Sequence, residues 1–111
     1  MTTMATRATA KQMRRHHITQ GARTTADGIV TSASSAVSIN GARLALEGDD
    51  VSCHACGCTG TIRCTGPRTA ERYNGKAVAL EGDLCICSCV TPPTLLPSQD
   101  FRYQALDDTA V

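Results

Sequence analysis

The sequence is poor in aromatic residues. Its 111 residues include no Trp, one Phe and two Tyr, and much of the 41% hydrophobic fraction is Ala and Cys. Aromatic side chains bury ~150–250 Å² each and dominate the cores of ordinary small domains. A core built from Ala, Val, Ile and Leu on so short a chain needs a metal, a disulfide or a partner to be stable.

Long apolar runs are also absent. No stretch reaches the ~18 consecutive apolar residues of a membrane-spanning helix, so we expect no stable membrane insertion. The N-terminus is basic but lacks the apolar segment of a secretory signal peptide, so we expect synthesis and folding in the reducing cytoplasm. Grouped cysteines in that compartment are more often metal ligands than disulfides, and their odd number, seven, favours the same interpretation.

Neither sign of charge is in excess. The formal net charge is +1, which gives no reason to expect nucleic acid as a partner. Five bases among residues 1–26 and three acids among residues 100–111 bias the two ends without forming a binding stripe. The chain also lacks a Ser-His-Asp order, a phosphate-binding loop and paired carboxylates, so we expect a protein that is not an enzyme.

The sequence does contain an internal repeat. "INGARLALEGDDVSC" (39–53) aligns with "YNGKAVALEGDLCIC" (73–87) at an offset of 34, and "LEGD" recurs whole. A weaker third copy is "TQGA" (19–22), in which Gly21 takes the place of Gly48 and Gly82. Similarity at a fixed offset indicates duplicated supersecondary units.

Each repeat predicts a β-hairpin. Asn-Gly between alternating residues is the strongest short-range hairpin signal, because a type I′ turn needs positive φ at both central positions. The turn at residues 40–41 would pair Ile39 with Ala42 and Ser38 with Arg43, and the second turn would pair Tyr73 with Lys76. Short strands, many Gly and Thr residues and no amphipathic helix predict an all-β fold.

The repeats place cysteines at two equivalent corners. Cys53 follows Asp49 by four residues, and Cys87 follows Asp83 by four. Zinc takes four N or S ligands in a tetrahedron, and two converging loops can supply two each. The predicted ligands are Cys53, Cys56, Cys87 and Cys89, with His54, Cys58 and Cys85 as alternates for one position. A disulfide-stapled site, buried free thiols and redox catalysis by the Cys-x-x-Cys pair are the competing interpretations.

Other reactive residue types have structural explanations. Cys64 falls on Val30 at the offset of 34, which predicts a buried, inert thiol. Asp49 and Asp83 each follow Gly in a turn, where Asp caps backbone amides. His16 and His17 follow two arginines in a polar segment, and we expect them to be solvated.

The flanks differ in composition from the repeated unit. We expect residues 1–17 to form a flexible N-terminal arm and residues 91–111 a Pro-rich C-terminal tail around a β domain at 18–90. Pro92, Pro93 and Pro97 favour an extended conformation and exclude a regular helix at the start of the tail.

The duplicated Asn-Gly-x-x-x-Ala-x-x-Gly-Asp unit with its Cys resembles the PAAR-repeat family over roughly residues 18–90. Members are the small tip proteins of type VI secretion spikes and related contractile machines. The resemblance implies a small cone of short β-hairpins with approximate three-fold internal repeat and a zinc ion near the tip. It implies a broad base that sits on a trimeric β-helical spike protein (VgrG). Because one cone with pseudo-symmetric repeats can meet a three-fold axis only once, we expect one chain per trimer.

The resemblance also assigns residues. The family Cys after the middle Gly-Asp becomes Cys53, its His three residues later becomes Cys56, and the Cys after the last Gly-Asp becomes Cys87. The early family His falls near Ala26 and is missing, as is most of the Pro-Ala-Ala-Arg signature. Additional thiols at Cys85 and Cys89 could compensate for the missing ligand.

Two classes of function follow. The first is a structural spike tip that holds zinc, caps the trimer and helps to carry effectors, with the arm or tail recruiting a separate effector or adaptor. The second is a zinc-ribbon-like module that binds nucleic acid or protein, supported by the Cys-x-x-Cys pair and the basic arm. A thiol oxidoreductase is a weaker third. The repeat separates them, because a zinc ribbon does not require one.

Overall fold

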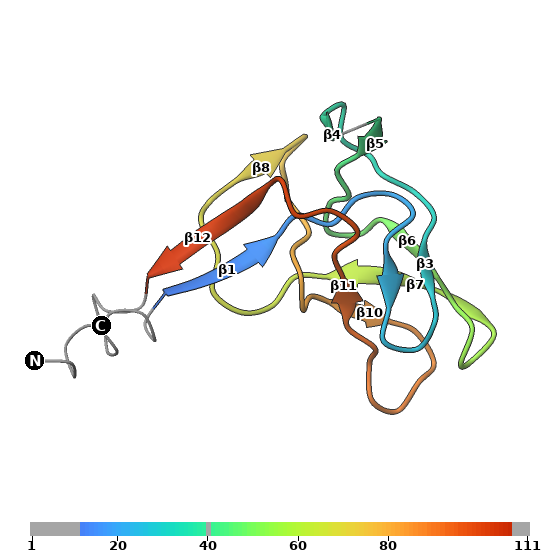
Figure 1. Ribbon diagram of the computed structural model, residues 1–111. Helices are drawn as coiled ribbons and strands as arrows, with labels where there is room; N and C mark the ends of the chain where they lie inside the picture. The colour runs from blue at the N-terminus through green and yellow to red at the C-terminus, as the bar shows by residue number, and fades with distance from the viewer. Residues whose placement is uncertain (1–11, 40, 108–111) are drawn as a thin grey trace, which may run out of the picture.

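The computed structural model describes residues 12–39 and 41–107, which form an all-β structure without helices in those ranges. Accordingly, no helix there is long and apolar enough to cross a membrane. The strands, labelled in Figure 1, are β1 (Gln12–His16), β2 (Arg23–Thr24), β3 (Ile29–Val30), β4 (Ser38–Ile39), β5 (Ala42–Arg43), β6 (Asp50–Cys53), β7 (Cys58–Arg63), β8 (Arg72–Tyr73), β9 (Lys76–Ala77), β10 (Leu84–Ile86), β11 (Leu95–Leu96) and β12 (Tyr103–Asp107).

A six-stranded sheet forms the body of the molecule. Its order is β10-β7-β6-β3-β2-β11, and every pair in it is antiparallel. An isolated bridge between Leu84 and Thr94 joins the two ends of the sheet, so the sheet nearly closes on itself. Small and branched side chains fill its interior, as the composition requires.

Three segments meet at the centre in a ring of backbone hydrogen bonds. The N–H of Ile18 donates to the carbonyl of Ala79, that of Ala79 to Ala45, and that of Ala45 back to Ile18, each over 2.9 Å. All three residues are fully buried. The segments around residues 18, 45 and 79 therefore occupy equivalent places in this ring, in agreement with the weak third copy of the repeat. Gly21, Gly48 and Gly82 share the same left-handed backbone (φ 95°, 93° and 87°).

The two predicted hairpins are present. Ser38 pairs with Arg43 and Ile39 with Ala42, as the turn chemistry predicts, and Tyr73 pairs with Lys76. Asn74 and Gly75 both have positive φ (54° and 77°), as a type I′ turn requires. Asn40 in the other predicted turn lies outside the described residues. The inner faces of both hairpins join a second apolar cluster of Ile39, Leu44, Leu46, Val78 and Leu80, against which Val37 and Tyr73 pack.

The third position in this arrangement is occupied by β1 and β12, the first and last strands of the described residues. β1 pairs antiparallel with β12, with His16 opposite Tyr103 and Arg15 opposite Gln104. The N–H of His17 donates to Arg102, as the equivalent N–H of Leu44 donates to Val37 and that of Val78 to Glu71. The β1–β12 ribbon is thus the third hairpin, without a connecting turn (Figure 1).

This pairing corrects the predicted flanks. A flexible arm is wrong for residues 12–17, because they contribute β1 to the folded unit. The tail belongs to the same unit, since residues 91–107 contribute β11 and β12. Residues 1–11 and 108–111 lie outside the described ranges. The expectation of solvated histidines is also wrong. His17 is buried and its Nε2 lies 2.9 Å from Oε1 of Glu71, while Nδ1 of the half-buried His16 lies 3.0 Å from Oε1 of Glu81. The extended conformation predicted after the prolines agrees with β11.

Candidate metal centre

The first cysteine loop joins β6 to β7. Cys53 ends β6 with its side chain buried, and Cys58 begins β7 directly opposite it. The four residues between them turn the chain, and Gly57 adopts a positive φ of 68°. This turn brings the half-buried Cys56 next to Cys53.

The second cysteine loop follows β10 and carries Cys87 and Cys89, both half-buried. The two loops are held together because β10 pairs with β7 at close range around Gly60. A Cβ atom at Gly60 would lie 2.6 Å from the carbonyl oxygen of Ile86 and 2.9 Å from Sγ of Cys85. Only glycine fits there, so Gly60 allows the approach that brings the loops together.

Four thiols converge where these loops meet. The Sγ atoms of Cys53, Cys56, Cys87 and Cys89 all lie within 4.8 Å of one another, and Sγ of Cys53 is 3.7 Å from Sγ of Cys89. A tetrahedron with Zn–S bonds of ~2.3 Å has S···S edges of ~3.8 Å, whereas a disulfide requires ~2.05 Å. All seven cysteines are free thiols. A four-cysteine cluster of this kind could bind a metal such as zinc.

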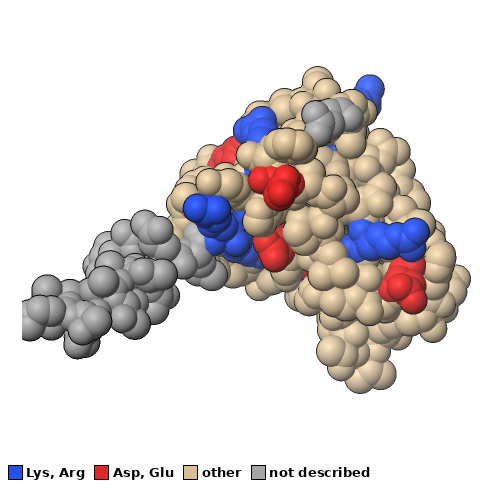
Figure 2. Space-filling model, in the orientation of Figure 1, with Lys and Arg blue, Asp and Glu red and all other residues tan. Residues whose placement is uncertain are grey.

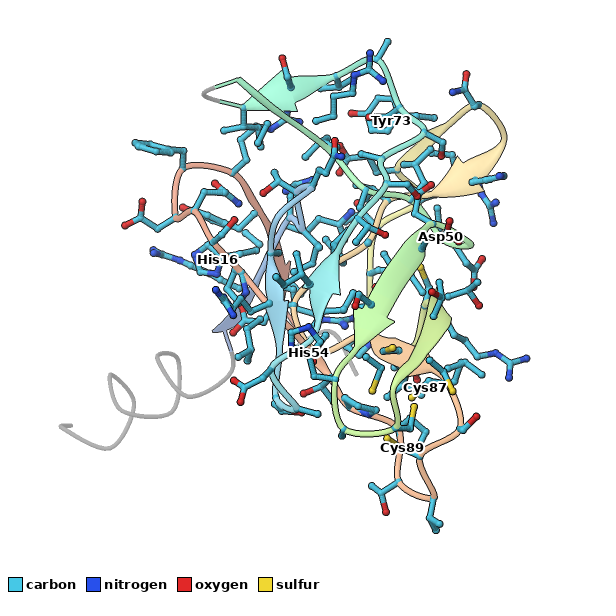
Figure 3. All side chains as sticks on the ribbon, turned by 90° about the vertical axis from the view of Figure 1, so that its right-hand side faces the viewer. His16, Asp50, His54, Tyr73, Cys87 and Cys89 are labelled. Atoms are coloured by element: carbon cyan, nitrogen blue, oxygen red, sulfur yellow. The ribbon has the colours of Figure 1, made fainter. Side chains whose placement is uncertain are left out.

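The cluster lies at one end of the molecule. In Figure 3, Cys87 and Cys89 lie at the end opposite Tyr73 and the two Asn-Gly hairpins. The corresponding corner of the first repeat unit, where Ala26 lies, has no Cys or His, and its Asp27 does not belong to the cluster. The second and third units supply two thiols each, as the repeat predicts.

The thiols interact as one titrating group. Desolvation opposes ionisation of Cys56, but hydrogen bonds with the Ser88 backbone, Cys53 and Cys87 outweigh it and lower the pKa of Cys56 to about 6. Hydrogen bonds with Cys87 and Cys53, together with desolvation, raise the pKa of Cys89 to about 12. One thiolate therefore forms readily and suppresses the next. A divalent cation would remove this mutual repulsion, so the donor set fits a metal.

The three alternates lie outside this group. His54 and Cys58 are exposed, and neither belongs to the four-thiol cluster. Cys85 is fully buried in the apolar core, where burial raises its pKa to about 12. The structure thus brings together Cys53, Cys56, Cys87 and Cys89, the four residues predicted as the main ligand set, and leaves the three alternates outside it.

The prediction for Cys64 is wrong in part. Its side chain is half-buried, because Ile62 and not Cys64 takes the place that Val30 has in the first unit. The N–H of Gly48 donates to Ile62 as the N–H of Gly21 donates to Val30. Burial, followed by the charge of Asp83, raises the pKa of Cys64 to about 12, which agrees with an inert thiol.

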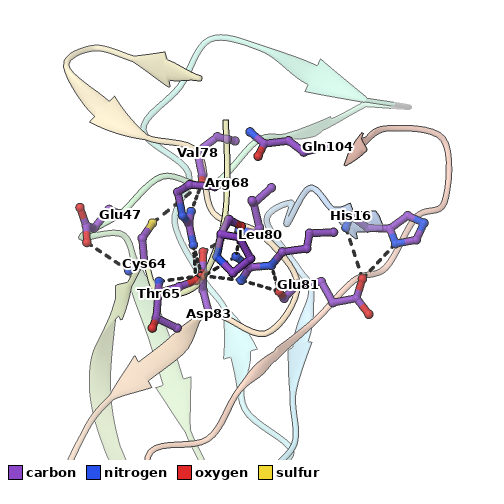
Figure 4. A network of polar contacts seen from close by, with 12 residues as sticks. His16, Glu47, Cys64, Thr65, Arg68, Val78, Leu80, Glu81, Asp83 and Gln104 are labelled. Carbon is purple, nitrogen blue, oxygen red and sulfur yellow. Dashed lines mark hydrogen bonds and ion pairs between the residues drawn. The ribbon is translucent and has the colours of Figure 1, made fainter. Parts of the chain in front are cut away.

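The two aspartates cap backbone amides, as predicted. Oδ2 of Asp49 accepts from the N–H of Leu46 over 2.7 Å, and Oδ2 of Asp83 accepts from Leu80 over 2.8 Å. Asp83 also accepts hydrogen bonds from Arg15 and from Arg68, and the Arg68 contact is labelled in Figure 4. Sequence reasoning missed both contacts. Extending the third repeat copy backward by the same spacing would have placed Arg15 in a strand.

Comparison with protein families identifies the family of the chain. The family model described as PAAR motif matches residues 20–92, more than half of the chain. The chain belongs to the PAAR motif family. Comparisons with curated proteins and with solved structures found no match. PAAR motif proteins are structural spike tips and not enzymes, so membership implies a type VI secretion spike-tip protein that binds a VgrG spike.

Proposed function

We propose that one chain of this PAAR protein caps one trimeric β-helical spike of the VgrG type. The observation that carries the proposal is the ring of hydrogen bonds through Ile18, Ala45 and Ala79. A single chain with three equivalent segments can match a true three-fold axis only once. The β4–β5 and β8–β9 hairpins and the β1–β12 ribbon then form the base of a cone that meets the spike.

The opposite end would be the point, with a zinc ion held by Cys53, Cys56, Cys87 and Cys89. Support comes from the distances among the four Sγ atoms and from their position away from the hairpins. Structural zinc contributes ~10 kcal/mol or more to the folding of small domains, a stabilisation that a core with few aromatic residues does not supply. Zinc would cross-link the two loops and make the point rigid enough to puncture a membrane.

The site of synthesis and export follows from the same proposal. The protein is made in the cytoplasm, loaded onto the spike and exported at its tip. A separate effector or adaptor would bind the part of the β1–β12 ribbon that the spike leaves uncovered. Phe101, just before β12, is 66% exposed, and Cζ of Arg14 lies 4.8 Å from the centre of the Tyr103 ring. Exposed aromatic residues and arginines are typical of protein interfaces, and two of the three aromatic residues of this chain lie here.

On the described residues, the charges visible on one face of the molecule (Figure 2) do not form the basic stripe that the zinc-ribbon alternative requires. On the face shown in Figure 2, basic and acidic side chains are interspersed among neutral residues. Nucleic-acid binding requires a basic stripe, and single-strand binding also requires stacking aromatics.

Mass measurement of a mixture with the trimeric spike protein of the same genome tests the proposal. We expect one chain per trimer, in a complex insensitive to salt because its contacts are mainly backbone pairing and apolar packing. Three chains per trimer would refute the capping geometry. No complex with any such spike, together with salt-dependent binding to nucleic acid, would favour the zinc ribbon.

A further inference from the structure

One thiol lies beside the cysteine cluster without belonging to it. Cys58 is exposed, and its Sγ lies 3.4 Å from the carbonyl oxygen of Cys56 and 3.4 Å from Oγ of Ser88. It therefore contacts both loops that carry the four converging thiols. Nothing in the proposed tip function uses this residue.

The partner of Cys58 across the hairpin is a member of the cluster. Cys58 and Cys53 are directly opposite in the β6–β7 ladder. Opposed Cα atoms in an antiparallel pair lie ~4.5–5.5 Å apart, within the ~4.4–6.8 Å that disulfides span. Their side chains share one face of the hairpin. A disulfide between them would require side-chain rotation and no change of the backbone ladder.

We propose that Cys58 is an oxidation site whose disulfide with Cys53 withdraws one ligand from the metal. Hydrogen peroxide oxidises the Cys58 thiol to a sulfenic acid and releases one water. The Cys53 sulfur then attacks the sulfenic sulfur; an S–S bond forms, the S–O bond breaks, and the hydroxide leaves as water after taking up a proton. In total, one peroxide gives two waters, and two thiols become one disulfide.

Exposure selects Cys58 for the first step. Cys53 is 1% exposed, and the other three cluster thiols are half-buried and would be held by the cation. Cys58 is the exposed one among the seven cysteines. Cys56 is a poor partner, because only Gly57 separates it from Cys58. With Cys53 in a disulfide, the metal would keep only three protein ligands and would be released. A tip that enters an oxidising compartment would therefore lose the cross-link between its two cysteine loops. This inference rests on the proposed zinc site.

The test treats the zinc-loaded full chain with hydrogen peroxide. A chromogenic chelator follows zinc release, and mass spectrometry of an unreduced digest maps the disulfide. We expect zinc release together with a Cys53–Cys58 linked peptide, and rebinding of zinc after reduction by a dithiol. Release from Cys58→Ser should be about tenfold slower, because the remaining thiols are shielded or metal-bound.

Cys64→Ser is the matched control, since Cys64 is half-buried and outside both cysteine loops; it should release zinc at the wild-type rate. Release from Cys58→Ser at the wild-type rate, or a disulfide without Cys58, would overturn this inference alone. Untreated protein that contains no zinc would instead overturn the proposed site, and this inference with it. Metal analysis before oxidation therefore separates the two failures.

Discussion

Nη2 of Arg15 donates a hydrogen bond to Oδ1 of Asp83 over 2.9 Å, and the two side chains are 9% and 0% exposed. Arg15 lies on β1 and Asp83 in the turn of the last repeat unit. The same guanidinium donates to the carbonyl oxygens of Glu81, Thr65 and Pro67. Arg68 also pairs with Asp83. The terminal strand is thus fixed to the repeat by a buried network, shown in Figure 4.

We predict that Asp83→Asn destabilises the fold far more than Asp49→Asn. The amide leaves two buried or half-buried guanidinium groups without a counter-ion, and breaking such a buried pair typically costs ~3–5 kcal/mol. Asp49 accepts mainly from backbone amides and serine hydroxyls, so its amide variant should lose ~1–3 kcal/mol. Urea unfolding of both zinc-loaded variants would measure the difference. Equal losses would show that the arginines contribute no net stability.

The proposed ligands make a second prediction. Protein purified without metal affinity should contain one zinc per chain by elemental analysis, and Cys53→Ser or Cys87→Ser should lose the zinc and most of the thermal stability. Cys64→Ser should change little, because that thiol donates only a long contact of 3.8 Å to the carbonyl of Val78. Comparable losses in all three variants would show that the ligand assignment is wrong.

Local signals made the repeats and hairpins predictable. The register around Ser38 and Arg43 follows from the Asn-Gly turn and from alternation, because a slip by one residue would expose Ile39 and Leu44. The convergence of Cys53, Cys56, Cys87 and Cys89 was predictable because the repeat places both loops at equivalent corners.

The β1–β12 ribbon was not predictable in the same way. Gln12 pairs with Asp107 from the opposite end of the chain, so no turn sequence marks the contact. Arg15 makes the main contacts that hold this ribbon, and it is buried. Nothing in the sequence distinguishes it from the other basic residues of the polar segment in which it lies. The equivalence of Ile62 and Val30 was not predictable from the alignment either. The number of residues between this position and the following Asn-Gly turn differs by two between the first and second units. Fixed-offset alignment therefore assigned Cys64 to that place.

Glu71 predicts a pH dependence of stability. Burial raises its pKa, but hydrogen bonds from Tyr73, Gln104 and His17 outweigh burial and lower the pKa from 4.5 to about 2. A carboxylate whose pKa is lower in the folded than in the unfolded chain stabilises the fold at pH values above its unfolded-state pKa. It loses that contribution as the pH falls through its folded-state pKa. The contribution of Glu71 should be complete above pH 4.5 and decline toward pH 2.

Comparison with Glu71→Gln isolates this effect. The difference in unfolding free energy between wild type and variant should shrink as the pH falls from 4.5 toward 2. Loss of metal from the cysteines at low pH affects both proteins and cancels in the difference. A difference that does not change with pH across this window would show that the carboxylate gains nothing from its partners in the folded state.

The final prediction concerns the central ring. The amides of Ile18, Ala45 and Ala79 each donate within it over 2.9 Å, and all three residues are fully buried. If the terminal ribbon belongs to the same cooperative unit, the three amides should exchange with solvent deuterium only on global unfolding and with one free energy. Native-state hydrogen exchange by NMR measures this directly, with the exposed hairpin-turn amides of Gly41 and Gly75 as fast-exchanging controls. Much faster exchange at Ile18 than at the other two would show that the first unit opens independently. A spike tip under mechanical load requires equal exchange at all three amides, because the closed ring then resists force as a single body.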